Sequence, residues 1–174
     1  MFSRMRGQVV TLELDDIEVE ILTNLVEQLL NLIHDPESDN HSDPLAQMVG
    51  LDGPTAISED PVLARLFPDA YPEDQSSSAD FRRFTQPDLR RTKELNAQRV
   101  RMHLNDFPGT EEIVEDMLNA WLLTLNDLRI ALGTRLGLDH ETQEQLEDDS
   151  LAPIFGLYDW LTGLQGTLVE VLEA

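Results

Sequence analysis

Residues 111–136 of the chain read EEIVEDMLNAWLLTLNDLRIALGTRL. Their apolar side chains recur every three or four residues, which is the spacing that places them on one face of an α-helix. Thr110 offers an N-cap before the stretch, and Gly137 can end the helix in the left-handed conformation. We therefore predict a long central helix with one wide apolar face, and with Leu123 and Ile130 as a second contact line. The wide face comprises Ile113, Val114, Met117, Leu118, Trp121, Leu122, Leu125, Leu128, Leu132 and Leu136.

Three further helices are predicted to surround this one, at residues 16–34, 89–105 and 152–173. Each has apolar residues at helical spacing. Asp15 or Asp16 can cap the first of them. Together with the central helix they would form the core of the domain.

Two details of these helices predict close packing. Helix 89–105 has one apolar stripe that includes Ala97 and Val100 and a second one at Leu95 and Met102, so we expect it to touch two neighbours. The last helix contains three glycines, which lower helix propensity and indicate the close approach of another helix. These glycines are Gly156, Gly163 and Gly166.

The N-terminal part of the chain has a different period. Residues 1–14 end in Val10, Leu12 and Leu14 at alternate positions, which predicts a strand or a hairpin turning at Gly7. Residues 35–60 are predicted to be an acidic loop with a short helix at 45–49. Its acidic residues resemble the start of a calcium loop, but Asn40 and Ala46 stand where that loop needs Gly and Glu.

Residues 61–106 are predicted to hold a short helix followed by arginine-rich helices. Asp60 can cap the short helix at Pro61. The region at 76–78 offers serines as caps for the next helix, which Pro87 should end or kink. The whole chain is thus expected to be a mainly α, single-domain helical bundle around a long central helix, with a small N-terminal β-strand or hairpin.

Composition narrows the possible functions. Twelve Lys and Arg stand against 34 Asp and Glu, a net charge of −22, which disfavours direct DNA binding and docking on anionic lipid. The absence of Cys excludes thiol catalysis, Cys-ligated zinc and disulfide sensing by this chain. Without a recognisable signal peptide or an apolar run long enough to cross a membrane, we expect a soluble cytoplasmic protein.

Motifs for catalysis are missing as well. The four histidines have no metal-ligand spacing, and the chain has no phosphate loop and no nucleophile elbow. We expect no enzymatic activity, no metal and no cofactor.

The basic residues are concentrated in one segment. Seven of the twelve lie between positions 82 and 101. They either pair internally with acidic residues or form a basic strip for an acidic protein surface or for DNA phosphate, and the acidic remainder of the surface favours a protein. Arginine suits internal and external pairing because it binds carboxylates in a bidentate manner. These residues are Arg82, Arg83, Arg90, Arg91, Lys93, Arg99 and Arg101.

Arg129 is the second unusual basic residue, because it falls within the apolar face of the central helix. A charge there must be paired or reach the edge of the face. We expect a structural ion pair with an Asp or Glu of a neighbouring helix.

Four blocks of the sequence resemble one family. They are DPVLARLFPDAY at 60–71, DFRRFT at 80–85, AWLLTLNDLRIALGTRLG at 120–137 and YDWLTGLQ at 158–165. These blocks, in this order, are similar to the actinomycete oxidative stress regulator (AosR-like) family, long catalogued as a domain of unknown function.

The resemblance implies a cytoplasmic, non-enzymatic regulator. In the family, a redox-responsive member contacts an alternative sigma factor of RNA polymerase and senses oxidation through a Cys-x-x-x-Cys disulfide. This chain has no Cys, so its redox sensing cannot follow that route. The function expected is transcription or oxidative stress regulation by contact with a protein, such as a sigma factor or RNA polymerase.

Two alternatives from other classes remain. One is a structural or adaptor homodimer that associates through Leu123 and Ile130 or through the glycine-bearing face of the last helix. The other is a ligand-binding protein or enzyme, for which a deep pocket gathering Arg129, Arg135 and a histidine would be the distinguishing feature.

Overall fold

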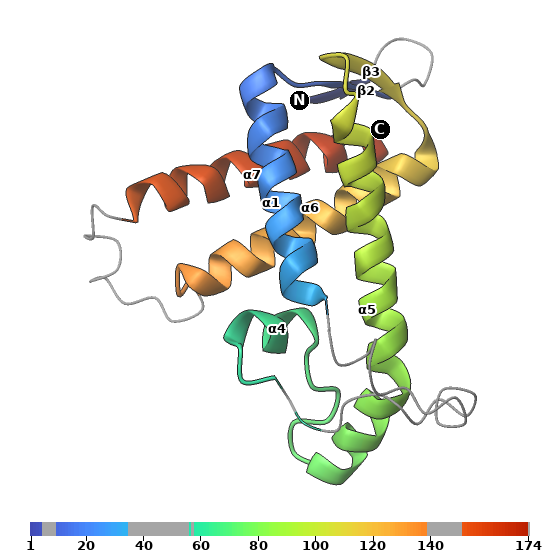
Figure 1. The fold of residues 1–174 in the computed structure, drawn as a ribbon, viewed down its shortest axis with the longest axis vertical. Coiled ribbons are helices and arrows are strands. Elements are labelled where there is room, and N and C mark those ends of the chain that lie inside the picture. Colours follow the sequence, from blue (N-terminus) through green and yellow to red (C-terminus); the bar gives the residue numbers. More distant parts are fainter. Residues whose placement is uncertain (5–9, 35–55, 57, 139–150, 174) are drawn as a thin grey trace.

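The computed structural model describes residues 1–4, 10–34, 56, 58–138 and 151–173 (Figure 1). In chain order its elements are β1 (Phe2–Arg4), β2 (Val10–Glu13), α1 (Asp16–Ile33), α4 (Pro61–Leu66), α5 (Gln75–Asn105), β3 (Thr110–Ile113), α6 (Glu115–Arg135) and α7 (Ala152–Glu173). The mainly helical architecture with a small sheet near the N-terminus is confirmed. The expected Gly7 turn and the expected helix at 45–49 lie outside the described residues.

The helices form two crossed layers. In Figure 1, α1 and α5 run side by side and cross over α6 and α7, and α4 lies against α6. Trp121 of α6 is fully buried at the centre, where it packs against Phe2 in a T-shaped arrangement with 5.8 Å between ring centroids. The core therefore joins the sheet to both layers of helices.

The expected start of the central helix at Glu111 is wrong. Residues 110–113 form β3, which pairs antiparallel with β2 in the sheet order β1-β2-β3. Gly109 has a φ of 88° and redirects the chain, and its carbonyl accepts a hydrogen bond from the amide of Leu14. Because the ladder with β2 satisfies the backbone groups of these residues, tertiary pairing overrides their helical spacing. The helix begins after Val114.

Helix α5 is longer than expected. It runs from Gln75 to Asn105 with Pro87 inside it, so the predicted end of a helix at Pro87 is wrong and residues 89–105 are the second part of one helix. Its N-cap is Asp74, whose carboxylate accepts from the amides of Ser76 and Ser77, so the serines are not the cap. The caps of α1 and α4 are as predicted: Asp15 forms a capping box, and Asp60 precedes Pro61.

The packing predictions are met only in part. Helix α5 contacts two neighbours, α1 and α6, as predicted, but Leu95 is 46% exposed and Met102 is 68% exposed, so the second stripe is not the buried contact surface. A Cβ built on Gly156, Gly163 or Gly166 of α7 would meet nothing within 4 Å, so close approach of a helix does not explain these glycines. Gly137 has a φ of 67° and ends α6 as predicted.

Candidate functional site

The arginine-rich segment on α5 divides into an inward and an outward set. Arg82 is buried and lies 3.5 Å from the carboxylate of Asp69. Arg90 donates to the carbonyl of Ile33 at the end of α1, and its guanidinium stands over the ring of Phe67 at 4.6 Å from the centroid. These two arginines therefore tie α5 to the rest of the molecule, which is the internal role considered above.

Lys93 belongs to the inward set too. Its ammonium lies 2.6 Å from the Asp127 carboxylate of α6, and the Asp127 side chain is almost fully buried. Burial raises the pKa of Asp127, and the hydrogen bond and charge of Lys93 partly oppose that shift. Sequence reasoning did not single out Asp127.

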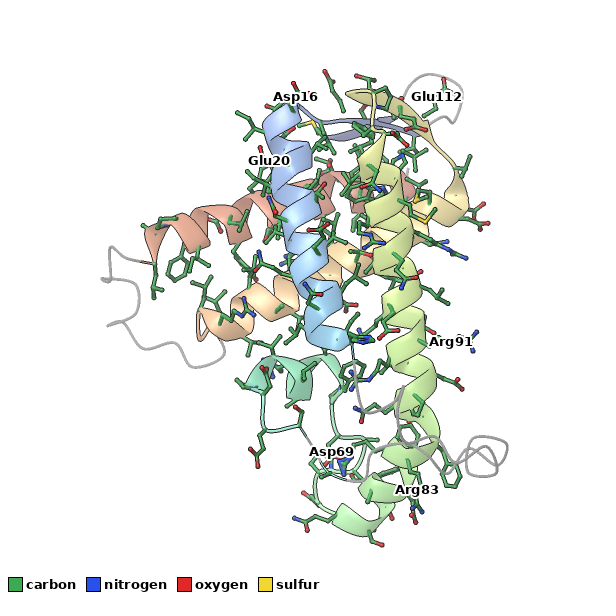
Figure 2. The ribbon with its side chains drawn as sticks, viewed as in Figure 1. Asp16, Glu20, Asp69, Arg83, Arg91 and Glu112 are labelled. Carbon is green, nitrogen blue, oxygen red and sulfur yellow. The ribbon has the colours of Figure 1, made fainter. Side chains whose placement is uncertain are left out.

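The outward set consists of Arg91 and Arg99, which are exposed, whereas Arg83 and Arg101 are half-buried and belong to neither set. In Figure 2, Arg91 points away from the body of the molecule. On an ideal helix, Arg91 and Arg99 fall within an arc of about 80° together with four exposed apolar residues of α5, and the exposed Asp88 lies in the same arc. We call this set the α5 stripe: Phe81, Phe84, Arg91, Leu95, Arg99 and Met102.

The α5 stripe has the composition of a protein interface. Aromatic residues, Met and Arg are enriched at such interfaces, whereas a solvated helix face is normally charged and polar. From Phe81 to Met102 it covers about 30 Å of helix at 1.5 Å per residue. Phe81 and Phe84 were missed by the sequence reasoning, because the expected break at Pro87 separated them from Leu95 and Met102.

Arg129 joins α6 to α7, but not through an ion pair. Its Nε donates to the Thr162 hydroxyl at 3.0 Å, one terminal nitrogen donates to the Gln165 amide oxygen, and the other lies 3.5 Å from the Tyr158 hydroxyl. The neighbouring helix was expected to supply a carboxylate. Among the described residues it supplies three neutral acceptors instead, so the positive charge of Arg129 is not neutralised there.

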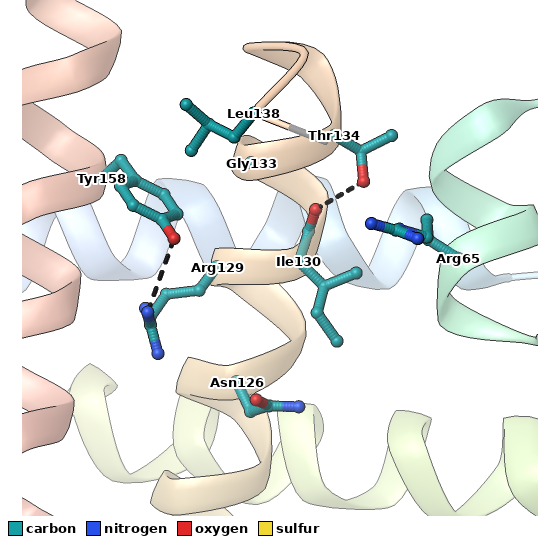
Figure 3. A pocket seen from close by; sticks show the side chains of 8 residues that line it. All are labelled: Arg65, Asn126, Arg129, Ile130, Gly133, Thr134, Leu138 and Tyr158. Carbon is teal, nitrogen blue, oxygen red and sulfur yellow. Dashed lines mark hydrogen bonds between the residues drawn. The ribbon is translucent and has the colours of Figure 1, made fainter. Parts of the chain in front are cut away.

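Arg129 also lines a pocket of about 240 Å³ over α6 between α4 and α7 (Figure 3). The pocket contains a second arginine, Arg65 of α4, but neither Arg135 nor a described histidine. It therefore matches only part of the feature that would favour a ligand-binding protein. Its lining residues are Arg65, Asn126, Arg129, Ile130, Gly133, Thr134, Leu138 and Tyr158.

Leu123 and Ile130, the residues predicted to form a homodimer contact on α6, differ in exposure. Leu123 of α6 is 47% exposed, whereas Ile130 is half-buried, packs against the core and lines the pocket. The two residues therefore do not form one exposed line.

The described part of the chain contains neither a metal-binding cluster nor a membrane-spanning helix. No group of three or more His, Asp or Glu side chains there could hold a metal ion. No helix in those ranges has the length and hydrophobicity needed to cross a membrane.

Comparison with known proteins gives consistent results. The model of the family described as "Domain of unknown function (DUF2017)" matches residues 1–172. The "Oxidative stress regulator AosR" of Mycobacterium tuberculosis (strain ATCC 25618 / H37Rv) is 35% identical over 89% of this chain and 78% of its own length. The "Putative oxidative stress regulator AosR" of Mycobacterium leprae (strain TN) is 36% identical over 90% of this chain and 79% of its own length. No solved structure matches the chain. The chain belongs to the AosR-like family, whose sequence model is described as domain of unknown function DUF2017.

Proposed function

We propose that this protein is a non-enzymatic cytoplasmic regulator that acts by binding another protein through the α5 stripe. The observation that carries the proposal is the row of exposed apolar side chains on one face of a long helix. Phe84 is 53% exposed and Met102 is 68% exposed. Covering such side chains with a partner removes apolar area from water, which favours association.

The arginines of the stripe indicate the character of the partner surface. Arg91 and Arg99 are exposed on a chain whose net charge is −22, so the stripe differs in charge from most of the protein. Arginine at an interface pairs best with carboxylates. The partner surface expected is an apolar groove with acidic residues at its edges.

The relatives support a regulatory role. The mycobacterial proteins are named oxidative stress regulators, and more than a third of the aligned residues in the Mycobacterium leprae protein are identical to this chain. By the resemblance described above, a sigma factor or RNA polymerase is the partner that we propose. Because this chain contains no Cys, its activity would not be gated by a disulfide of its own.

Affinity capture from native cells, followed by mass spectrometry and by binding to the purified component, tests this function. We expect the wild-type protein to retain an RNA polymerase or sigma subunit. The variant Leu95→Glu/Met102→Glu should lose it, because two charges would be placed in the apolar part of the contact. The matched control is Leu123→Glu, an equivalent change at an exposed leucine of α6.

Each outcome tests a different part of the proposal. If wild type retains no polymerase or sigma component, the transcription role is wrong. If Leu95→Glu/Met102→Glu binds as well as wild type, the α5 stripe is not the contact surface. If Leu123→Glu alone abolishes binding and converts a dimer to a monomer in light scattering, the adaptor homodimer is the better description.

A further inference from the structure

Met102 places an exposed thioether within the α5 stripe. The chain has five Met and no Cys, so thioethers are its only sulfur groups. The Met102 side chain is 68% exposed. We propose that Met102 is a site of reversible oxidation by hydroperoxides, and that its sulfoxide weakens the binding of a partner to the α5 stripe. This regulation rests on the function proposed above.

The reaction needs only a hydroperoxide and an accessible sulfur atom. A lone pair of the Met102 sulfur attacks the terminal oxygen of the hydroperoxide, an S–O bond forms, and the O–O bond breaks. The sulfur loses two electrons, and the leaving oxygen takes the proton and departs as an alcohol, or as water when hydrogen peroxide is the oxidant. Methionine sulfoxide reductases reverse the change: the sulfoxide oxygen leaves as water while two thiols are oxidised to a disulfide.

Burial distinguishes Met102 from the other described methionines. Met117 is half-buried and packs against the core, so a peroxide reaches it less easily and its oxidation would disturb core packing. Met1 is 63% exposed, but it lies in a hollow beside α7 and is not part of α5. Met5 and Met48 lie outside the described residues. Met102 is therefore the described methionine whose oxidation changes the α5 stripe and leaves the core intact.

The sulfoxide would affect both the apolar and the charged part of the contact. It is polar, so covering it with an apolar partner surface no longer gives the gain that covering a thioether gives. Arg99 precedes Met102 by three residues and Leu95 precedes it by seven, so the three side chains share one helix face. A sulfoxide oxygen beside Arg99 can accept from its guanidinium, which would draw that group away from a carboxylate of the partner.

Hydrogen peroxide treatment of the purified protein, followed by peptide mass spectrometry, tests the modification. We expect the sulfoxide of Met102 to form faster than that of Met117, because Met102 is the more exposed of the two. While Met117 remains reduced, the midpoint of urea unfolding should stay unchanged. Incubation with methionine sulfoxide reductases and dithiothreitol should restore the thioether.

Binding to the purified RNA polymerase or sigma subunit that the untreated protein retains tests the regulation. Only the regulator is treated, and catalase removes the peroxide before the subunit is added. Treatment should weaken binding of the wild type by about tenfold or more, since a polar group then lies in the apolar contact, and the reductases should reverse the loss.

Three variants assign the effect to Met102, each compared before and after treatment. Met102→Leu should show no change on treatment, whatever its own affinity, because leucine cannot be oxidised. Met102→Gln, which places a polar amide at this position, should bind about tenfold more weakly than Met102→Leu without any treatment. Met117→Leu is the matched control and should respond to peroxide as the wild type does.

Several results would overturn the proposal. These are oxidation of Met117 before Met102, unchanged affinity of the treated wild type, equal affinity of Met102→Gln and Met102→Leu, and a loss in treated Met102→Leu as large as in wild type. The last result would assign the response to another methionine. If the untreated protein retains no polymerase or sigma subunit, the proposed function itself is wrong. If the subunit binds reduced and oxidised protein equally well, only the regulation is wrong.

Discussion

The indole Nε1 of Trp121 donates a hydrogen bond of 3.1 Å to Nδ1 of His103. The other ring nitrogen of His103 lies 3.1 Å from the Glu111 carboxylate. Since Nδ1 accepts from the indole, a neutral His103 carries its proton on Nε2 and donates it to Glu111. This chain of groups connects α6, the last turn of α5 and β3, and it satisfies the polar atom of the largest buried side chain.

Replacing His103 with Leu should destabilise the protein by about 1–3 kcal/mol, because the buried Trp121 N–H would lose its acceptor. The quantity to measure is the free energy of unfolding in urea, followed by far-UV circular dichroism. Glu111→Gln is the control, since its side-chain oxygen can still accept from Nε2, and we expect a change within about 0.5 kcal/mol. Equal effects of the two substitutions would contradict the role given to the Trp121–His103 bond.

The Lys93–Asp127 pair allows a prediction about pH. Lys93→Met leaves the Asp127 carboxylate buried without its partner, and we expect a loss of about 3 kcal/mol at neutral pH. Asp127→Asn should cost less, because the long Lys93 side chain can reach water.

The sign of the pH effect follows from Asp127. Its pKa is raised in the folded protein, and without Lys93 the pKa should rise further. Between the unfolded and folded pKa values, the folded state then binds more protons, so stability increases as pH falls through the folded pKa. The loss caused by Lys93→Met should therefore shrink from pH 7 toward about 4, the ordinary pKa of Asp. Urea unfolding of wild type and Lys93→Met across this pH range measures the difference in their unfolding free energies. A difference that grows toward acid pH would refute the interpretation.

Local signals in the sequence determine much of this fold. The capping box of Asp15 and Glu18, the Asp60–Pro61 start of α4 and the Gly137 end of α6 could be predicted, because each depends on residues within one turn of the chain. The apolar spacing of α1, α6 and α7 likewise requires only the helical period.

The errors concern partners that are distant in sequence. Strand β3 pairs with β2, which lies about a hundred residues earlier, so the helical spacing at residues 110–113 could not reveal it. The same holds for Arg129. A helical wheel shows that it is surrounded by apolar residues, but not whether α7 presents a carboxylate or, as the structure shows, Thr162 and Gln165.

Replacing glycine with alanine should have opposite effects on the unfolding free energy within α7 and just after the end of α6. Gly163→Ala adds a Cβ into open space in a helix interior, so we expect a gain of about 0.5–1 kcal/mol in unfolding free energy. Gly137→Ala forces an L side chain to adopt a φ of 67°, so we expect a loss of about 1–2 kcal/mol. Urea unfolding of both variants measures the difference. A loss in Gly163→Ala would show that another element needs this surface.

Pro87 interrupts the hydrogen bonding of α5 without ending the helix. Proline has no N–H, so the carbonyl four residues earlier loses its usual donor, and the cost in a helix interior is about 3 kcal/mol relative to alanine. Proline also restricts the unfolded chain, which stabilises the folded state by about 0.4–1 kcal/mol. Pro87→Ala should therefore stabilise the protein by roughly 2 kcal/mol, the difference between these two terms.

The matched control for Pro87→Ala is Gln98→Ala, because Gln98 is an exposed interior position of the same helix with a propensity close to that of alanine. It should change the unfolding free energy by less than about 0.5 kcal/mol. Both changes are measured by urea unfolding. If Pro87→Ala destabilised the protein while Gln98→Ala did not, the packing of α5 would depend on the helix geometry that Pro87 imposes. Phe81 and Phe84 precede Pro87 and Leu95 and Met102 follow it, so that geometry would also set how the two parts of the α5 stripe are presented to a partner.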